Sequence, residues 1–523
     1  MTFPGNPIPG ANLLSDGDVS SVGGIFSNSL KLLGSLRQLP WLLAALGLMA
    51  VHASAASLSF TVTANEPVTV TGTPRIAIDV GGTARYAAFA AGSGTSALTF
   101  SYAVQAGDFD ADGIDVGTQL DLNGATITDA AGNPMAALSF TKPETSALKV
   151  QTYTAAYTST ANPAAVSFTI SKAPINAAFN YTISSNGGSE TVTGSGTIAA
   201  SPQAVSGVDV SGLAAGTLTL SVTVTNATGT GAARTAAFTP SFVGALDTAP
   251  ATSSSYSVRR LRAAYTGPLL RVRRSTDNAE QDIGATVAGD LNATALTSFC
   301  GAASCYVRSW YDQSGNARDA TQPAAASQPR IVNAGVIEKV NSRPAIKGDG
   351  VDDQMLFSLG PLVSYPVSIN IVLAKTSASE RGAWVKLGGL AANSGGIALG
   401  VGSSANFYTF GQNIVGLKET VVWMPTSTVL ASSAVITYTQ GAGTNSTAMF
   451  QNGSTVSGTN FSNAPLVPNG TTGYLFGHTL FNSEQRWSAN PISEAVLAPS
   501  AFSTSERQAL ERGQGTYYGI TVQ

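Results

Sequence analysis

Short runs of alternating apolar and polar residues, separated by turn residues, constrain this chain more than any other feature. Between residues 57 and 150 they include SFTVTANEPVTVTG, RIAIDVGG and ALTFSYAVQ, and between 163 and 242 they include ETVTGSGTIAA and GTLTLSVTVTNATG. Alternation sends successive side chains to opposite faces of a strand, so one face of each run can be buried. Runs of this length and spacing are typical of antiparallel sandwiches. We therefore predict an all-β protein.

Length and composition support several β domains. The chain has 523 residues, of which 55 are Gly, and charged residues make up only 11%. Such a length exceeds that of most single domains, and Gly supplies the positive φ angles that tight turns need. The formal net charge of −3 gives no basic surface for a polyanion. We therefore expect no nucleic-acid partner.

The first 56 residues are predicted to form an N-terminal arm followed by an apolar segment. The run LPWLLAALGLMAVHASAASLSF is about as long as a signal-peptide core and short for a bilayer span. One alternative is a cleaved signal, because ASA precedes Ala56 as in a cleavage site. The other is an uncleaved anchor that docks on other surface or virion proteins. Both alternatives stay open from the sequence.

Residues 57–150 resemble the bacterial immunoglobulin-like repeats of surface adhesins. The resemblance rests on NEPVTVTGTPRIAIDVGG, ALTFSYAVQAGDFDADGIDVG and LDLNGATITDAAGNP. It implies an immunoglobulin-like sandwich that acts as a spacer. The periodicity of residues 151–245 predicts a second immunoglobulin-like sandwich, to which we assign no chemistry because it lacks a titratable cluster.

Three acids in GDFDADGID are candidate ligands for Ca²⁺. Asp108, Asp110 and Asp112 stand at alternate positions before Gly113, which permits a sharp turn. A complete calcium hand would have an acid where Gln119 stands. A solvated acidic turn is the alternative, and the segment DGVDD (residues 349–353) offers the same choice.

The only two cysteines, Cys300 and Cys305, lie in FCGAASC. Because the chain has only two histidines and no second cysteine pair, a zinc site would lack ligands. A short-loop disulfide in an oxidising compartment is therefore expected. A pair of reduced thiols stays open, because sequence does not show which way the side chains face.

The last part of the chain, residues 246–523, resembles the catalytic domain of the arabinofuranosidase B family at its beginning. In that family a YS…SG…RGSDD stretch precedes an FC…C pair and a YDQSGNG…TQ loop. The matching positions here are Tyr256, Arg274, Asp277, Cys300, Cys305 and residues 311–316. The resemblance implies a concanavalin A-like jelly-roll sandwich with a disulfide between the two cysteines.

The same resemblance implies two catalytic carboxylates, which retaining glycosidases use as nucleophile and acid/base. The run that should carry the nucleophilic Glu, SGGIALGVGSSANFYTFG, contains no acid. The run that should carry the Asp acid/base, GYLFGHTLFNSEQRW, offers His478 and Glu484 but no Asp. We therefore expect no catalytic residues and a domain that binds rather than cleaves.

The stretch SWYDQSGNARDATQ carries the candidate ligand-binding residues. Sugar sites combine acids, amides and an aromatic platform, and the candidates here are Trp310, Tyr311, Asp312, Gln313, Asn316 and Asp319. The alternative is a strand with one buried aromatic residue, followed by a self-bonded polar turn. Six nearby arginines between 259 and 274 are expected to pair in part with Asp277, Glu280 and Asp282.

Two short helices are predicted in this domain. The first covers ATALTSF before the cysteines, and the second begins at a capping box formed by Ser503 and Glu506. Gly513 is the predicted C-cap of the second helix.

Together these features predict an extracellular fibre- or adhesin-type structural protein on a virion or cell surface. The C-terminal domain also resembles those of bacteriophage structural and fibre proteins. Its expected partner is a cell-surface glycan or host receptor, with a homo-oligomer as a further expectation. The alternative is a secreted α-L-arabinofuranosidase-type glycoside hydrolase.

Overall fold

The computed structural model describes residues 45–49, 57–135, 137–249, 251–363, 366–375, 382–388, 397–401, 407–412, 419–425, 432–442, 446–460, 470–479 and 485–523. They divide into two compact units. Unit 1 holds residues up to 184 together with 191–210 and 217–239, and unit 2 holds 185–190, 211–216 and 240–523. Strands dominate both units, and the described residues include two α-helices, which confirms the predicted all-β class.

The first sheet of unit 1 is antiparallel and follows the predicted alternation. Its strands run in the order β2 (Ser57–Thr71), β5 (Thr95–Ala103), β4 (Thr83–Ala91), β3 (Arg75–Val80) and β7 (Asp115–Asp121). In β2, Leu58, Phe60 and Val62 are buried while their neighbours are partly exposed. The end of β2 also pairs with β8 (Thr126–Thr128).

Unit 1 has two further sheets of three or more strands. One contains β10 (Thr154–Ser159), β11 (Val166–Ser171) and β14 (Gln203–Val208), and the other is centred on β15 (Leu218–Asn226). The strands β12 (Ala178–Ser185) and β17 (Arg234–Phe238) flank β15. Every second side chain of β15 is buried from Leu218 to Val224, which supplies the apolar face of this sheet.

Most of the predicted apolar N-terminal segment lies outside the described residues. Ala45–Met49 form β1, which pairs antiparallel with β2. Within the described ranges, no helix has the length and apolar character needed to cross a bilayer. The choice between a cleaved signal and an anchor stays a prediction.

Unit 2 contains a closed, antiparallel arrangement of strands, consistent with the predicted jelly roll. At its centre β29 (Val367–Ala374) lies between β34 (Ser433–Gln440) and β41 (Pro491–Ala498), and β41 also pairs with β18 (Ser254–Ser257). The core includes the buried rings of Tyr256, Trp310 and Trp384. Residues 254–257 are thus joined to the end of the chain by backbone pairing.

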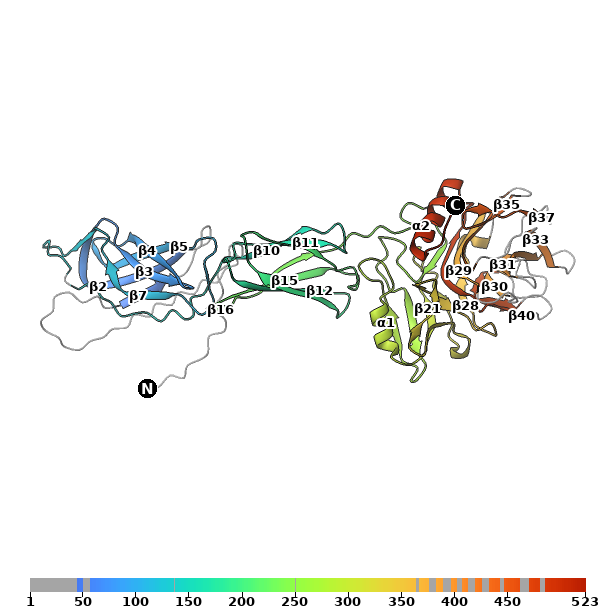
Figure 1. Ribbon diagram of the computed structural model, residues 1–523, viewed down its shortest axis with the longest axis horizontal. Helices are drawn as coiled ribbons and strands as arrows, with labels where there is room; N and C mark the ends of the chain where they lie inside the picture. The colour runs from blue at the N-terminus through green and yellow to red at the C-terminus, as the bar shows by residue number, and fades with distance from the viewer. Residues whose placement is uncertain are drawn as a thin grey trace. The chain divides into compact units, whose positions relative to one another are not determined.

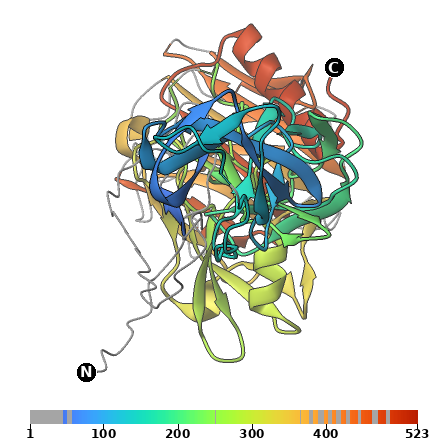
Figure 2. The ribbon, with the colours of Figure 1, turned by 90° about the vertical axis from the view of Figure 1, so that its left-hand side faces the viewer.

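The two helices lie at opposite edges of unit 2 (Figures 1 and 2). Helix α1 (Ala293–Cys300) is capped by Asn292, and helix α2 (Thr504–Tyr518) begins with the predicted capping box of Ser503 and Glu506. The predicted end of α2 is wrong, because the helix continues past Gly513. It ends at Gly519, whose φ of +65° suits a C-cap.

Candidate functional site

The disulfide joins the end of α1 to the start of β21 (Cys305–Trp310). The Sγ atoms of Cys300 and Cys305 are 2.05 Å apart, and both residues are buried. The predicted pairing is confirmed. A disulfide agrees with the expected oxidising, extracellular environment.

The aromatic pair of the predicted sugar-binding stretch divides between core and surface. Trp310 is fully buried, with its ring centroid 5.8 Å from that of Tyr256 and 6.2 Å from that of Phe476. Tyr311 is half-buried, and its hydroxyl donates a hydrogen bond of 2.8 Å to Asp282. Trp310 therefore offers no open face to a ligand, whereas Tyr311 remains partly accessible.

The side chains of Asp312 and Gln313 connect the turn to neighbouring backbone by hydrogen bonds. One oxygen of Asp312 accepts the N–H groups of Ser255 and Ser314, at 2.8 and 2.9 Å. The Gln313 amide accepts from the N–H of Leu261 at 2.8 Å and donates to a nearby carbonyl. Both side chains are buried, so their polar atoms are used within the fold.

Asn316 and Asp319 complete the same turn. The Asn316 amide donates to the carbonyls of Thr252 and Ser253, both at 3.0 Å, and Asp319 accepts the N–H of Asp312 at 2.9 Å. The structure thus brings all six candidate residues together around one turn. Sugar binding by these residues stays a prediction, because their observed contacts are those of a self-bonded turn.

The arginine concentration is paired in part, as predicted. Arg271 of β19 (Leu270–Arg274) binds Asp282 of β20 (Glu280–Ile283) at 2.8 Å, and Arg274 binds Asp277 at 2.7 Å. Glu280 instead pairs with Arg308, at 3.1 Å. Together with the pair of Arg259 and Glu494, these ion pairs neutralise three of the six arginines among the described residues.

Burial and hydrogen bonding shift the pKa of the Asp282 carboxyl in opposite directions. Burial would raise the pKa of its carboxyl, but the hydrogen bonds from Arg271 and Tyr311 outweigh this effect and lower the pKa. Burial, together with the neighbouring Asp282 charge, raises the pKa of Tyr311 to about 12. Asp282 is therefore an ionised acceptor at neutral pH, and Tyr311 is a neutral donor.

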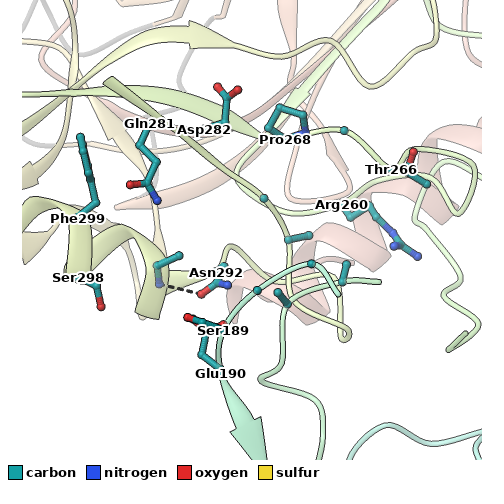
Figure 3. Close-up of a pocket in the computed structure, with 18 of the residues that line it drawn as sticks. Ser189, Glu190, Arg260, Thr266, Pro268, Gln281, Asp282, Asn292, Ser298 and Phe299 are labelled. Carbon is teal, nitrogen blue, oxygen red and sulfur yellow. Dashed lines mark hydrogen bonds between the residues drawn. The ribbon is translucent and has the colours of Figure 1, made fainter. Parts of the chain in front are cut away.

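A pocket of about 700 Å³ opens beside these strands (Figure 3). Its lining includes Glu190, Gln281, Asp282, Asn292 and Phe299. Sequence reasoning missed this pocket, since its walls come from segments far apart in the chain. The only local signal was Asn292, which stands before a predicted helix as N-cap residues do.

The acids of the first predicted Ca²⁺ site have other partners in unit 1, and Ca²⁺ binding there stays a prediction. Asp108 is buried and bonds to Arg85 at 3.0 Å, and Asp110 accepts the N–H groups of Gly81 and Gly113 at 2.7 and 2.8 Å. Among the described residues, Asp108, Asp110 and Asp112 do not form a convergent carboxylate cluster. The oxygens expected to bind a cation instead accept hydrogen bonds within the fold.

The second acidic segment does form a cluster. Carboxylate oxygens of Asp349, Asp352 and Asp353 lie within 4.8 Å of one another. Asp353 is buried and accepts the N–H of Asp349 at 2.8 Å. Burial and the neighbouring Asp349 charge raise the pKa of Asp353 to about 7. Ca²⁺ binding at this turn stays a prediction.

Comparison with known proteins shows what the segment around the disulfide is similar to. Residues 241–346 match the family model for the catalytic region of α-L-arabinofuranosidase B. A probable α-L-arabinofuranosidase B of Aspergillus terreus is 40% identical over 74 residues, which are 14% of this chain and 15% of that protein. An α-L-arabinofuranosidase of Hypocrea jecorina is 38% identical over 82 residues, 15% of this chain and 16% of that protein.

A solved structure is also similar at low identity. It is a GH54 α-L-arabinofuranosidase soaked with a cyclic sulfate inhibitor, with a TM-score of 0.39, 13% identity, and coverage of 52% of this chain and 64% of that chain. This likeness is too slight to bear on function.

These matches overturn the expected non-catalytic role. The prediction of a virion, bacteriophage, fibre or adhesin structural protein is wrong, because the recognisable part of unit 2 matches an enzyme's catalytic region. The resemblance to arabinofuranosidase B is confirmed over that segment. The expectation rested on two positions where the sequence has no acid, and the match shows that this does not separate the segment from an enzyme's catalytic region.

Proposed function

We propose that this chain is a glycoside hydrolase that acts on α-L-arabinofuranosides, and that it works outside the cell. The observation that carries the proposal is the match of residues 241–346 to the catalytic region of α-L-arabinofuranosidase B. The disulfide at Cys300 and Cys305 lies within that segment and suits secretion.

Glycoside hydrolysis by the usual route needs two carboxyl groups. After residue 346 the sequence contains nine Asp and Glu residues: Asp349, Asp352, Asp353, Glu380, Glu419, Glu484, Glu494, Glu506 and Glu511. In the arabinofuranosidase B family, which residues 241–346 resemble, both catalytic carboxylates follow the matched segment, so these nine acids are the candidates.

Three of the glutamates have structural partners. Glu494 bonds to Arg259, Glu506 closes the capping box of α2, and Glu511 bonds to Thr437 at 2.7 Å. Their carboxylates stabilise the fold at positions close to α2. Glu380, Glu419 and Glu484 are the remaining glutamates, and we propose the catalytic pair among them on the sequence alone.

The acidic turn at residues 349–353 is the alternative location for the catalytic pair. The oxygens of Asp349 and Asp353 are within 4.8 Å, and the pKa of Asp353 is raised to about 7 by burial and by the charge of Asp349. A carboxyl group with a raised pKa close to a second carboxyl group is an arrangement that glycosidases use for acid/base catalysis. However, Asp349 accepts the N–H of Val351 at 2.7 Å and Asp353 accepts that of Asp349, so both are committed to the turn.

The substrate class is tested with the purified full chain and two chromogenic glycosides. We expect release of 4-nitrophenol from 4-nitrophenyl α-L-arabinofuranoside and at least about tenfold slower release from 4-nitrophenyl β-D-xylopyranoside. Equal or preferred cleavage of the xylopyranoside would overturn the proposed substrate class. Release from neither, by a chain that melts cooperatively, would overturn hydrolysis of these glycosides.

A further inference from the structure

The pocket in Figure 3 belongs to unit 2, and several segments form its walls. They include the tip at residues 187–190, the loop 265–268, strand β20 and helix α1. Segment 211–216 is fixed against the same region, because Ala215 donates to the carbonyl of Ala285 at 2.9 Å. The volume of about 700 Å³ lies within the usual range of about 300–1,000 Å³ for small-molecule sites, so the pocket can hold a ligand.

One arginine in the pocket wall has a guanidinium group without a partner. Arg260 is half-buried, and its Nε is shielded from solvent and donates to no atom in the described part of the chain. Among the same residues no carboxylate forms an ion pair or a hydrogen bond with this guanidinium. The other five arginines between residues 259 and 274 each donate to at least one side chain or carbonyl. Arg260 is therefore the cation of this group that is left for a ligand.

The surroundings of Arg260 support its guanidinium without neutralising it. The Cζ atom lies 3.9 Å from the centroid of the Phe242 ring. Burial lowers the pKa of Arg260, and the charge of Asp247 offsets this only in part. The oxygens of Asp247 instead accept the N–H groups of Gly244 and Ala263, at 2.6 and 2.9 Å. A guanidinium stacked on an aromatic ring in this way is pre-organised to bind a carboxylate through two parallel N–H groups.

Four charged side chains line the pocket, and two of them are already neutralised. Arg274 and Asp282 have ion-pair partners outside the lining, at 2.7 and 2.8 Å. The other two, Arg260 and Glu190, form no ion pair with each other among the described residues, and Figure 3 shows them on different sides of the pocket. A matching ligand therefore carries an anionic group for Arg260 and hydrogen-bond donors for Glu190.

The uncharged part of the lining is polar and aromatic. It includes the side chains of Tyr265, Thr266, Gln281, Ser298 and Phe299. Figure 3 shows Ser298 and Phe299 on one side of the pocket and Thr266 beside Arg260 on the other. Amides and hydroxyls both donate and accept hydrogen bonds, and aromatic rings offer apolar surface. Such a lining suits a polyhydroxyl ring better than a small zwitterion, which would engage the two charges and leave the neutral polar groups without partners.

We propose that this pocket binds an acidic saccharide, with a sugar carboxylate held by Arg260 and sugar hydroxyls donating to Glu190. The site uses none of the carboxylates proposed for catalysis. The inference goes beyond the proposed hydrolysis and does not rest on it, because an acidic sugar chain would be held on unit 2 even where no bond is cleaved.

The test is calorimetric titration of the purified full chain with three probes. Trigalacturonate is the acidic saccharide, maltotriose is a neutral saccharide of the same length, and alanylalanine is a zwitterion without sugar hydroxyls. None of them carries an arabinofuranosyl group that the proposed activity would remove. We expect saturable binding of trigalacturonate and at least about tenfold weaker binding of the other two probes.

Four variants locate the binding, and one serves as a control. Arg260→Lys keeps the charge but loses the paired donors, and should weaken trigalacturonate binding about tenfold, whereas Arg260→Met should weaken it about 100-fold. Ser298→Trp adds bulk at an exposed lining position and should also weaken binding at least about tenfold. Glu190→Gln removes a negative charge but keeps an acceptor, and should bind at least as tightly as the wild type. The control, Arg308→Met, removes a positive charge outside the lining, from the pair with Glu280, and should bind like the wild type.

The outcomes separate this proposal from the proposed hydrolysis. Weaker binding by the Arg260 variants and by Ser298→Trp, with an unchanged rate on 4-nitrophenyl α-L-arabinofuranoside, supports a separate site for acidic saccharides. If no hydrolysis is found, the comparison of binding among the variants still stands. The proposal is overturned if trigalacturonate does not bind, if maltotriose or alanylalanine binds more tightly, or if Glu190→Gln loses the binding. Equal weakening by Arg308→Met and Arg260→Met, or wild-type binding by both Arg260→Met and Ser298→Trp, would overturn it as well.

Discussion

Arg259 and Glu494, 235 residues apart in the sequence, form a buried ion pair beneath α2, with 2.8 Å between Nε and Oε2. Their side chains are 11% and 0% exposed. Glu494 also accepts hydrogen bonds from Tyr518 at 2.9 Å and Gln514 at 3.0 Å. Burial alone would lower the pKa of Arg259, but the Glu494 charge outweighs it and raises that pKa. The pair thus helps to join the segment that follows β18 to the last helix of unit 2.

Removing one partner of this pair should destabilise the protein strongly. Arg259→Leu leaves the Glu494 carboxylate buried without its cation, which costs about 3–5 kcal/mol. Urea unfolding followed by tryptophan fluorescence measures the change. The control is Arg271→Leu, which breaks the half-exposed pair with Asp282 and should cost less than about 1 kcal/mol. If both variants lost the same free energy of unfolding, the conclusion that the buried Arg259 pair stabilises the fold more than the half-exposed Arg271 pair would be contradicted.

The turn at Asp312 should depend on its carboxylate oxygens more than on its charge. Asp312→Ala removes acceptors for the N–H groups of Ser255, Ser314 and Arg318, and should lower the free energy of unfolding by about 2–4 kcal/mol. Asp312→Asn retains one oxygen acceptor and should lose about half as much. Thermal melting compares the two variants. If neither substitution lowered the melting temperature, the hydrogen bond from Ser255 of β18 to Asp312 would not stabilise the fold as described.

Asp353 should make unit 2 less stable as the pH rises. Its pKa is raised from 3.8 to about 7 by burial and by Asp349, so the unfolded chain gives up this proton at lower pH than the folded chain. This contribution to stability is present below about pH 4 and is lost as the pH rises through about 7. Asp353→Asn, which keeps an acceptor for Asp349, should gain on the order of 1–2 kcal/mol relative to wild type between pH 4 and pH 8. The free energy of unfolding is measured for both proteins across this pH range. If the two values changed with pH in parallel, this effect of Asp353 would be excluded.

The disulfide should contribute modestly to stability because it closes a short loop. Five positions separate Cys300 from Cys305, and a loop of this size corresponds to about 2 kcal/mol in the chain-entropy account. The double variant Cys300→Ser/Cys305→Ser should therefore melt lower than the wild type but still fold. A melting temperature unchanged by the substitution would show that the cross-link adds nothing to unit 2.

Local features were predictable from the sequence because local chemistry decides them. Alternation identified strands such as β2 and β15, and Ser503 and Glu506 identified the start of α2. The end of α2 was not predictable in this way. Gly513 costs helix stability but has open space around its Cα, and packing of the helix carries it on to Tyr518.

Contacts between segments that lie far apart in the chain could not be predicted from the sequence. The ion pair of Arg259 with Glu494 and the pocket at Asn292 depend on which strands meet, and periodicity does not determine that. Asp108 and Asp110 looked like cation ligands because of their spacing. In the fold, Arg85 and backbone N–H groups take their oxygens instead.

The central claim, hydrolysis by carboxylates that follow the matched segment, is tested most directly by a glutamine scan. The rate of 4-nitrophenyl α-L-arabinofuranoside hydrolysis is measured for the wild type and for Glu380→Gln, Glu419→Gln and Glu484→Gln, with Glu280→Gln as a folded control. We predict that two of the three variants lose about 10²–10⁴-fold in rate while the control retains wild-type activity. Full activity in all three variants, or loss of activity on Asp353→Asn in their place, would contradict the account.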